Sequence, residues 1–145
     1  MRLVILMIAS AAAVVAQPAT DTGAASSLDF AFFKTRVQPI FLVRREGHAR
    51  CYACHSIGTP YRLQRLSPGA STWNDEQSRK NFEATVNMIN FQDIDASPLL
   101  VYALEAKAGG NKFHPGGKHW DSKSAPEWRT LDEWAHGKKA ASASR

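Results

Sequence analysis

The spacing of apolar side chains predicts a first helix that begins near Leu28, with Ser26 or Ser27 as its N-cap. Apolar residues then return every three or four positions, which places them on one face of a helix. This face consists of Phe30, Phe33, Val37, Ile40 and Phe41. Pro39 lies within the same stretch, and because proline lacks a backbone N–H it should end or kink the helix at about Gln38.

A polar capping signal precedes the second predicted helix, which should begin near Asp75. Asn74 can cap its first turn, and Gln77, three residues later, can complete a capping box. The apolar stripe of this helix consists of Phe82, Val86 and Ile89. The prediction also places Met88 inside the helix, about 120° from Phe82 and therefore off the main stripe.

Proline and glycine mark both ends of the third predicted helix. Ser97 is the expected N-cap and Pro98 takes the first helical position, where its missing N–H has no consequence. The helix should then run from Leu99 to Ala108 and end at Gly109 and Gly110.

The fourth predicted helix has the same two signals and spans roughly Pro126 to His136, with Gly137 just past its end. The residues that share its apolar face are Trp128, Leu131, Trp134 and Ala135. Because few stretches alternate with the period of a strand, the sequence predicts an all-α domain of about four helices.

The segment between the first two helices carries the most specific motif of the chain. Residues Cys51-Tyr52-Ala53-Cys54-His55 spell CxxCH, which is the attachment signal for a c-type haem. Two thiols at this spacing can each form a thioether to one vinyl group of the same porphyrin, and the adjacent histidine supplies an axial nitrogen. The sequence therefore predicts one covalent haem c, with Cys51 and Cys54 as its thioether residues and His55 as the proximal iron ligand.

Two other readings of the cysteines stay open at this point. A CxxC disulfide of thioredoxin type would need a strand before the motif, where the sequence predicts a helix. A zinc site could combine Cys51 and Cys54 with His114 and His119, a permitted ligand set. The 60 positions between Cys54 and His114 far exceed the ~12–15 residues of a zinc finger.

The N-terminal residues have the layout of an export signal. A positive residue, Arg2, is followed by an apolar run of 14 residues, Leu3 to Ala16, and Val14-Val15-Ala16 offers small residues for cleavage. A bilayer span needs ~20 apolar residues, so cleavage before Gln17 is preferred over an uncleaved anchor. We therefore expect a periplasmic or other extracytoplasmic protein, soluble after cleavage, with membrane anchoring as the alternative.

The rest of the sequence predicts one small domain with a flanking segment on each side. Residues 1–16 would be the signal, 17–27 a flexible leader, 28–137 the folded domain and 138–145 a disordered basic tail. Lys and Arg outnumber Asp and Glu by 18 to 13, a mild excess that suits docking on an acidic partner. The sequence has no basic helix and no aromatic platform motif, which argues against nucleic-acid binding.

The order of these elements resembles that of small mono-haem c-type cytochromes of class I. The resemblance rests on a helix before CxxCH, on the motif itself and on a tryptophan-bearing last helix, and it covers Leu28 to Gly137. It implies a small helical bundle around the haem in which the first and last helices pack together, with Phe33 and Trp134 as candidates for that contact. A narrower resemblance, to exported haem domains, rests on Ser97 to Leu100 and on the Gly109 to Gly117 loop.

The sixth iron ligand is where the chain departs from that family. Class I cytochromes usually take a methionine from the loop before the last helix, but here that loop carries His114 and His119 and no methionine. Glycines on both sides of His114 allow the backbone to approach the porphyrin closely. His114 is therefore the preferred distal ligand, Met88 is the first alternative, and His119 or an open position remain.

These expectations together predict an electron carrier rather than an enzyme. With both axial positions filled, no small-molecule substrate would bind the iron, and the partners would be redox proteins. Two alternatives remain open. One is a haem enzyme or gas sensor with an open sixth position, and the other is a haem-bearing subunit of a respiratory or photosynthetic membrane complex.

Overall fold

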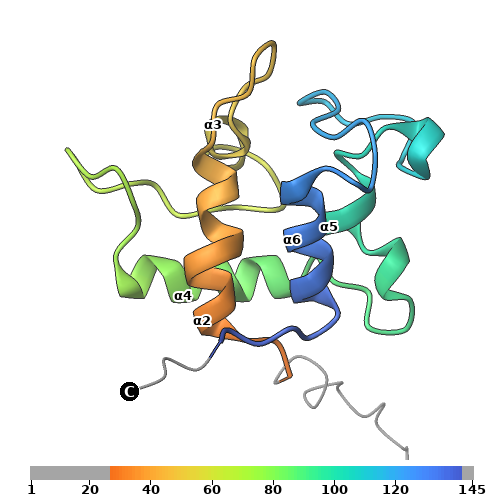
Figure 1. The fold of residues 1–145 in the computed structure, drawn as a ribbon. Coiled ribbons are helices and arrows are strands. Elements are labelled where there is room, and N and C mark those ends of the chain that lie inside the picture. Colours follow the sequence, from red (N-terminus) through yellow and green to blue (C-terminus); the bar gives the residue numbers. More distant parts are fainter. Residues whose placement is uncertain (1–26, 142–145) are drawn as a thin grey trace, which may run out of the picture.

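The computed structural model describes residues 27–141, and this part of the chain is helical and has no strand. The elements in chain order are α2 (Phe30–Phe32), a π-helical stretch (Phe33–Val37), a 3-10 helix (Gln38–Leu42), α3 (Cys51–His55), α4 (Asp75–Val86), a 3-10 turn (Ile94–Ala96), α5 (Pro98–Val101), a second 3-10 turn (Ala106–Ala108) and α6 (Pro126–Ala135). The longest helix, α4, lies across the lower part of the view in Figure 1, and the loop before α3 and the loop before α6 lie at the upper end. The expected all-α fold class is confirmed at this level.

The first helix begins and ends at other residues than predicted. Its N-cap is Asp29, whose carboxylate accepts a hydrogen bond from the N–H of Phe32 at 2.6 Å, so the expected capping by Ser26 or Ser27 is wrong. Pro39 does not end the helix, which continues to Leu42 in tighter 3-10 geometry. The missing N–H of proline is accommodated by this change of helix type, which coincides with Gln38, the expected position of the kink.

The capping box predicted for α4 is confirmed. The side chain of Asn74 accepts from the N–H of Gln77 at 2.9 Å, and the side chain of Gln77 accepts from the N–H of Asn74 at 3.1 Å. The helix ends at Val86, however, so the prediction that Met88 lies inside it is wrong. Met88 lies in the turn that follows, where its N–H bonds to the carbonyl of Thr85.

The third predicted helix is largely wrong. Only Pro98–Val101 is α-helical, and the chain beyond it pairs with the loop before α6. Ala103 accepts a backbone hydrogen bond from His119 at 2.8 Å, and Glu105 donates one to Trp120 at 2.9 Å. Although Leu104 to Ala108 has good helix formers, this pairing satisfies backbone groups that a helix would otherwise use, and tertiary context overrides propensity.

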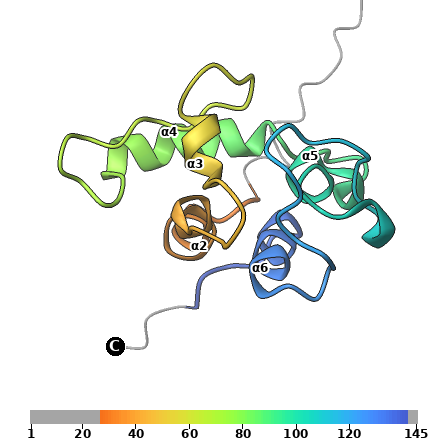
Figure 2. The same ribbon diagram turned by 90° about the horizontal axis from the view of Figure 1, so that it is seen from above.

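The last helix is confirmed, and it packs against the first. The rings of Phe33 and Trp134, both fully buried, lie 5.3 Å apart between centroids, and the Trp134 indole donates to the carbonyl of Asp29 at 3.1 Å. Figures 1 and 2 both show α2 and α6 side by side, with α5 next to α6. This contact, which the family resemblance implied, forms the centre of the hydrophobic core.

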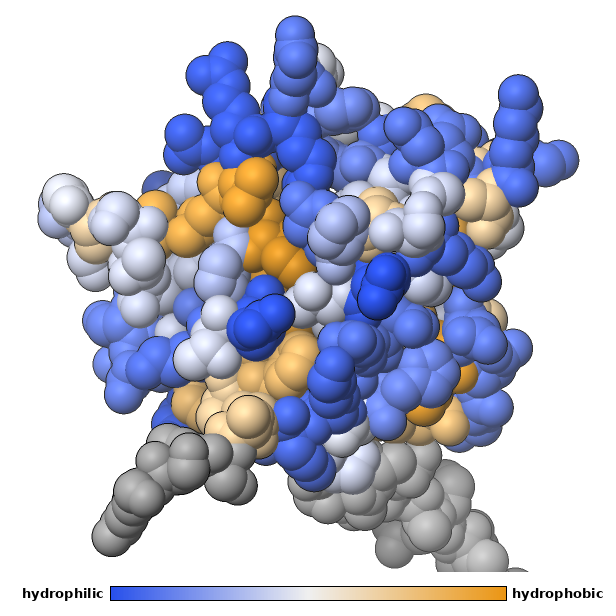
Figure 3. Space-filling view, in the orientation of Figure 1, coloured by the Kyte–Doolittle hydropathy of each residue, from blue (hydrophilic) through white to orange (hydrophobic). Residues whose placement is uncertain are grey.

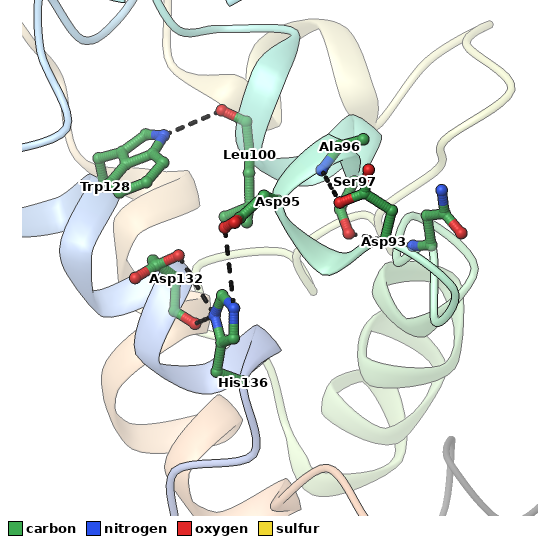
Figure 4. A network of polar contacts seen from close by, with 9 residues as sticks. Asp93, Asp95, Ala96, Ser97, Leu100, Trp128, Asp132 and His136 are labelled. Atoms are coloured by element: carbon green, nitrogen blue, oxygen red, sulfur yellow. Dashed lines mark hydrogen bonds and ion pairs between the residues drawn. The ribbon is translucent and has the colours of Figure 1, made fainter. Parts of the chain in front are cut away.

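A polar cluster joins the C-terminal end of α6 to the 3-10 turn at residues 94–96 (Figure 4). The exposed His136 lies with Nδ1 2.9 Å from the carbonyl of Asp132 and with Nε2 3.8 Å from the carboxylate of Asp95. A positive histidine in this position is favoured by the partial negative charge of the helix end. Within residues 27–141 no helix is long and apolar enough to cross a membrane, and the expected signal, residues 1–16, lies outside the described part of the chain.

Candidate cofactor-binding site

A cavity of about 520 Å³ lies between α3, α5 and the loop that precedes α6. Its volume falls within the range of about 300–1,000 Å³ that is usual for ligand and cofactor sites. The walls are mainly apolar and include Phe41, Pro60, Leu99, Tyr102, Trp120 and Leu131. The same walls carry every side chain that the sequence proposed for the site: Cys51, Cys54, His55, Met88, His114 and His119.

The two thiols reach this cavity from one face of α3. Cys51 and Cys54 are three positions apart on a helix, a spacing that places their side chains next to each other. Both are free thiols, so the structure gives no support to the disulfide alternative. Burial raises the pKa of the Cys51 thiol, and the nearby positive charge of Arg45 partly offsets that rise. Both cysteines are therefore placed to react with a group held in the cavity.

The imidazole of His55 is oriented by the segment that follows α3. Its Nδ1 lies 2.9 Å from the carbonyl of Tyr61 and 3.1 Å from the hydroxyl of Thr59. Since a carbonyl can only accept, Nδ1 carries the proton and Nε2 keeps its lone pair. Burial lowers the pKa of His55, although the Tyr61 carbonyl acts in the opposite direction. This is the arrangement of a metal-binding histidine, neutral and fixed by a backbone carbonyl.

His114 is held in the same manner by its own loop. Its Nδ1 lies 2.7 Å from the carbonyl of Gly117, which again leaves Nε2 with a free lone pair. Gly117 has a φ of +81°, in the left-handed region that glycine adopts without strain. A Cβ atom on Gly116 would lie only 3.1 Å from Cε1 of the His114 ring. These two glycines thus allow the tight turn in which the imidazole lies against the backbone of its own loop.

The two imidazoles have a spacing that suits one metal between them. Their centroids are 6.3 Å apart and their planes are inclined by 18°. Metal–nitrogen bonds of about 2.0 Å on opposite sides of one ion would place the centroids about 6 Å apart, since each nitrogen lies about 1 Å from its ring centre. Within residues 27–141 neither Nε2 atom has a hydrogen-bond partner. Both are therefore available as ligands.

Polar atoms without hydrogen-bond partners lie on two residues of the cavity wall and on Arg45, which lies next to one of them. Among the described residues these include the indole Nε1 of Trp120, Nδ1 of His119 and Nη1 of Arg45. The Arg45 guanidinium lies 5.5 Å from the centroid of the Trp120 ring and pairs with Glu127 through Nη2 at 3.2 Å. Buried donors without partners are rare and costly, so this group suits a ligand that brings its own acceptors, such as carboxylates.

His119 itself is neutral at physiological pH. Burial lowers its pKa to about 4, and the positive charges of His48 and Arg45 add to the effect. Its ring lies 5.1 Å from that of His48, which is half-buried. The sequence offered no signal that would select Arg45 among the arginines, or Trp120 among the tryptophans, for this side of the cavity.

The zinc reading finds no support in the described residues. Of residues 27–141, the group whose ligand atoms all lie within 4.8 Å of one another is Asp95, Asp132 and His136, outside the cavity. Cys51, Cys54, His114 and His119 line a common cavity but do not form such a group. Met88 also lines the cavity and stays geometrically possible as a ligand, but it lacks the close facing arrangement that His114 has with His55.

The chain was also compared with known proteins. No protein family, no curated protein and no solved structure matches the chain.

Proposed function

We propose that this chain is an exported mono-haem c-type cytochrome that carries single electrons between redox proteins. The observation that carries the proposal is the pairing of His55 with His114. The ring centroids of the two imidazoles lie 6.3 Å apart, each ring has Nδ1 bound to a backbone carbonyl, and the two thiols of a CxxCH motif line the same cavity. This combination of thiols and nitrogens would suit a c-type haem with two axial histidines.

The other residues of the cavity fit a haem as well. A porphyrin is a large apolar disc, and the walls of the 520 Å³ cavity are mainly apolar. Its two propionates are carboxylates, and the unpartnered donors on Trp120, Arg45 and His119 would satisfy them.

The haem, when bound, supplies the one-electron chemistry, and the protein sets the conditions for it. His55 and His114 would occupy both axial positions, which keeps small molecules away from the metal. Their Nδ1–H bonds to Tyr61 and Gly117 fix the rings and make the Nε2 lone pairs more basic. The low polarity of the walls excludes water. These features favour electron transfer over substrate chemistry.

The same arrangement bears on the two alternatives. A haem enzyme or gas sensor would need an open distal position, whereas we propose that His114, whose ring centroid lies 6.3 Å from that of His55, fills it. Carbon monoxide should therefore leave the spectrum of the ferrous protein unchanged. The anchored-subunit alternative depends on the leader, residues 1–16, and N-terminal sequencing of the mature protein decides it. We propose cleavage near Gln17 and an extracytoplasmic location.

Covalent attachment is the direct test of the proposal. The intact protein, made in a host that attaches c-type haem, should exceed the mass of its mature polypeptide by one haem. Acidified acetone should not extract that haem, because thioethers resist acid. Cys51→Ser and Cys54→Ser should each lower the yield of holoprotein, and an unmodified mass for the unsubstituted chain would overturn the proposal.

A further inference from the structure

The two ends of the molecule differ in charge. Residues 43–65 and 105–123, the loops around the cavity, carry nine Lys and Arg against three Asp and Glu. The rest of the described chain carries seven Lys and Arg against nine Asp and Glu. The cavity end therefore has a net charge of +6 and the remainder −2, an asymmetry that orients the molecule in the field of a charged partner. Two haem propionates would leave the cavity end at +4.

The exposed apolar side chains gather at this same end. In residues 27–141 the large hydrophobic residues classed as exposed are Val43, Ile57, Tyr102 and Phe113. Tyr102 lines the cavity, and Ile57 and Phe113 are close in sequence to the two histidines. Figure 3 shows hydrophobic surface next to the hydrophilic chains at the upper, loop-bearing end of the view. None of these four residues lies on α4 or α6.

Phe113 is the most informative of the four. Its side chain is 77 % exposed, although it directly precedes His114 and its loop is held by backbone hydrogen bonds at both ends. The loop needs its glycines and His114 for the cavity, but nothing within the described chain requires an aromatic ring at position 113. An exposed aromatic residue next to basic ones, such as Lys112 and Lys118, is the composition of a protein-binding surface.

We propose that this surface, centred on Phe113 and its neighbour Lys112 within the basic loops around the cavity, is the docking site for an acidic redox protein. Charge complementarity selects a partner whose own docking face is negative, and Phe113 supplies the apolar contact at the centre. The inference rests on the proposed function, because electron exchange is the reason for a partner to dock beside His114. Docking here places the partner next to one axial ligand, which shortens the path of the electron.

The test uses reduced plant-type ferredoxin, an acidic one-electron donor, and the same ferredoxin with its carboxylates amidated. In each transfer one electron passes from the reduced cluster to the ferric haem, and no bond is made or broken. We expect the second-order rate constant with native ferredoxin to fall about tenfold between about 20 mM and 200 mM salt. The rate with amidated ferredoxin should be lower at low salt and nearly independent of salt.

Matched variants locate the site. Lys112→Glu should lower the low-salt rate by about threefold to tenfold, whereas Arg36→Glu, the same change of charge on the first helix, should alter it by less than about twofold. Phe113→Ser should lower the rate several-fold, and Phe113→Leu should retain most of it. Equal effects of Lys112→Glu and Arg36→Glu, or a rate that salt does not change, would overturn the docking inference.

Two further measurements distinguish an error in the docking site from an error in the proposed function. Reduction of each variant by a neutral hydroquinone should proceed at the rate of the unsubstituted protein if only docking has changed. Binding of oxidised ferredoxin, measured by NMR titration, does not depend on electron transfer and should weaken with Lys112→Glu only. Absence of covalent haem would refute the proposed function, and binding unaffected by Lys112→Glu would refute the docking site.

Discussion

The helical frame and the loops around the cavity achieve order in different ways. The frame consists of the first helix, α4 and α6, and its stability depends on buried aromatic and aliphatic side chains such as Phe33, Leu131 and Trp134. The loops at residues 43–65 and 102–123 contain little regular structure and are held by single hydrogen bonds and by glycines. Stability thus resides mainly in the frame, and the candidate chemistry resides mainly in the loops.

Several contacts join these two regions. The carboxamide of the fully buried Asn81, on α4, accepts a hydrogen bond from the backbone N–H of Gln64 at 2.6 Å. The hydroxyl of Tyr61 lies 2.9 Å from the hydroxyl of Thr85, which is also on α4. Residues 59–64 are therefore fixed from the frame, and with them the carbonyl of Tyr61 that orients His55. The comparison predicts that changes in the frame act on global stability, and that changes in the loops act on the cavity.

The largest expected effect is in the frame. Trp134→Ala would remove a fully buried indole that contacts Phe33 and Phe82 and that bonds to Asp29, leaving a large hole. We expect the free energy of unfolding to fall by about 3–5 kcal/mol. Urea denaturation of the holoprotein measures this change.

Phe113→Ala is the matched control in the loops. It removes an aromatic ring that is 77 % exposed, so stability should change by no more than about 0.5 kcal/mol. Similar losses for Phe113→Ala and Trp134→Ala would remove the distinction between the two regions.

Gly110→Ala should disturb the loops and spare the frame. A Cβ atom at this position would lie 1.9 Å from the carbonyl oxygen of Leu104, so the backbone pairing around it has to shift. We expect a loss of about 1–3 kcal/mol, within the usual range of single substitutions. The near-ultraviolet signal of the buried tryptophans should persist while the haem absorption changes, because the shifted segment carries His114. At Gly69, by contrast, no atom lies within 4 Å of an added Cβ and only the φ of +76° disfavours alanine, so Gly69→Ala tests backbone strain alone.

The sequence predicted the local signals of the frame better than its long-range contacts. The capping box of Asn74 and Gln77 and the proline and glycine at the two ends of α6 act within one or two turns, so they can be read from neighbouring residues. The helix expected at 99–108 failed because the residues that pair with Ala103 and Glu105 come from 119 and 120. No pattern local to that stretch indicates such a partner.

The residues of the candidate site also fall into two groups, those that the local sequence predicted and those that it could not select. The CxxCH spacing is local, and the cavity does contain Cys51, Cys54 and His55 as the motif requires. His114 was expected from its place in the loop before the last helix, and the structure brings it to His55. The unpartnered donors of Arg45 and Trp120 could not be selected, because their position depends on packing between segments 75 residues apart.

A small loss of stability, within the frame, should come from removing the cap of α4. Asn74→Ala removes the side-chain acceptor for the N–H of Gln77, and this should lower the free energy of unfolding by about 1 kcal/mol. Asn74→Asp keeps an acceptor and places a negative charge at the helix N-terminus, so it should preserve stability. Thermal unfolding of the two variants checks the prediction. Equal losses would indicate that the capping box contributes nothing measurable.

The distal ligand is the central claim, and absorption spectroscopy of three proteins tests it most directly. The unsubstituted ferric protein and Met88→Leu should both be low-spin and lack the weak near-infrared band of sulfur ligation, because two imidazoles bind the iron. His114→Ala should become partly high-spin, and its ferrous form should bind carbon monoxide. A sulfur band that is present in the unsubstituted protein and lost in Met88→Leu, with His114→Ala still low-spin, would contradict ligation by His114.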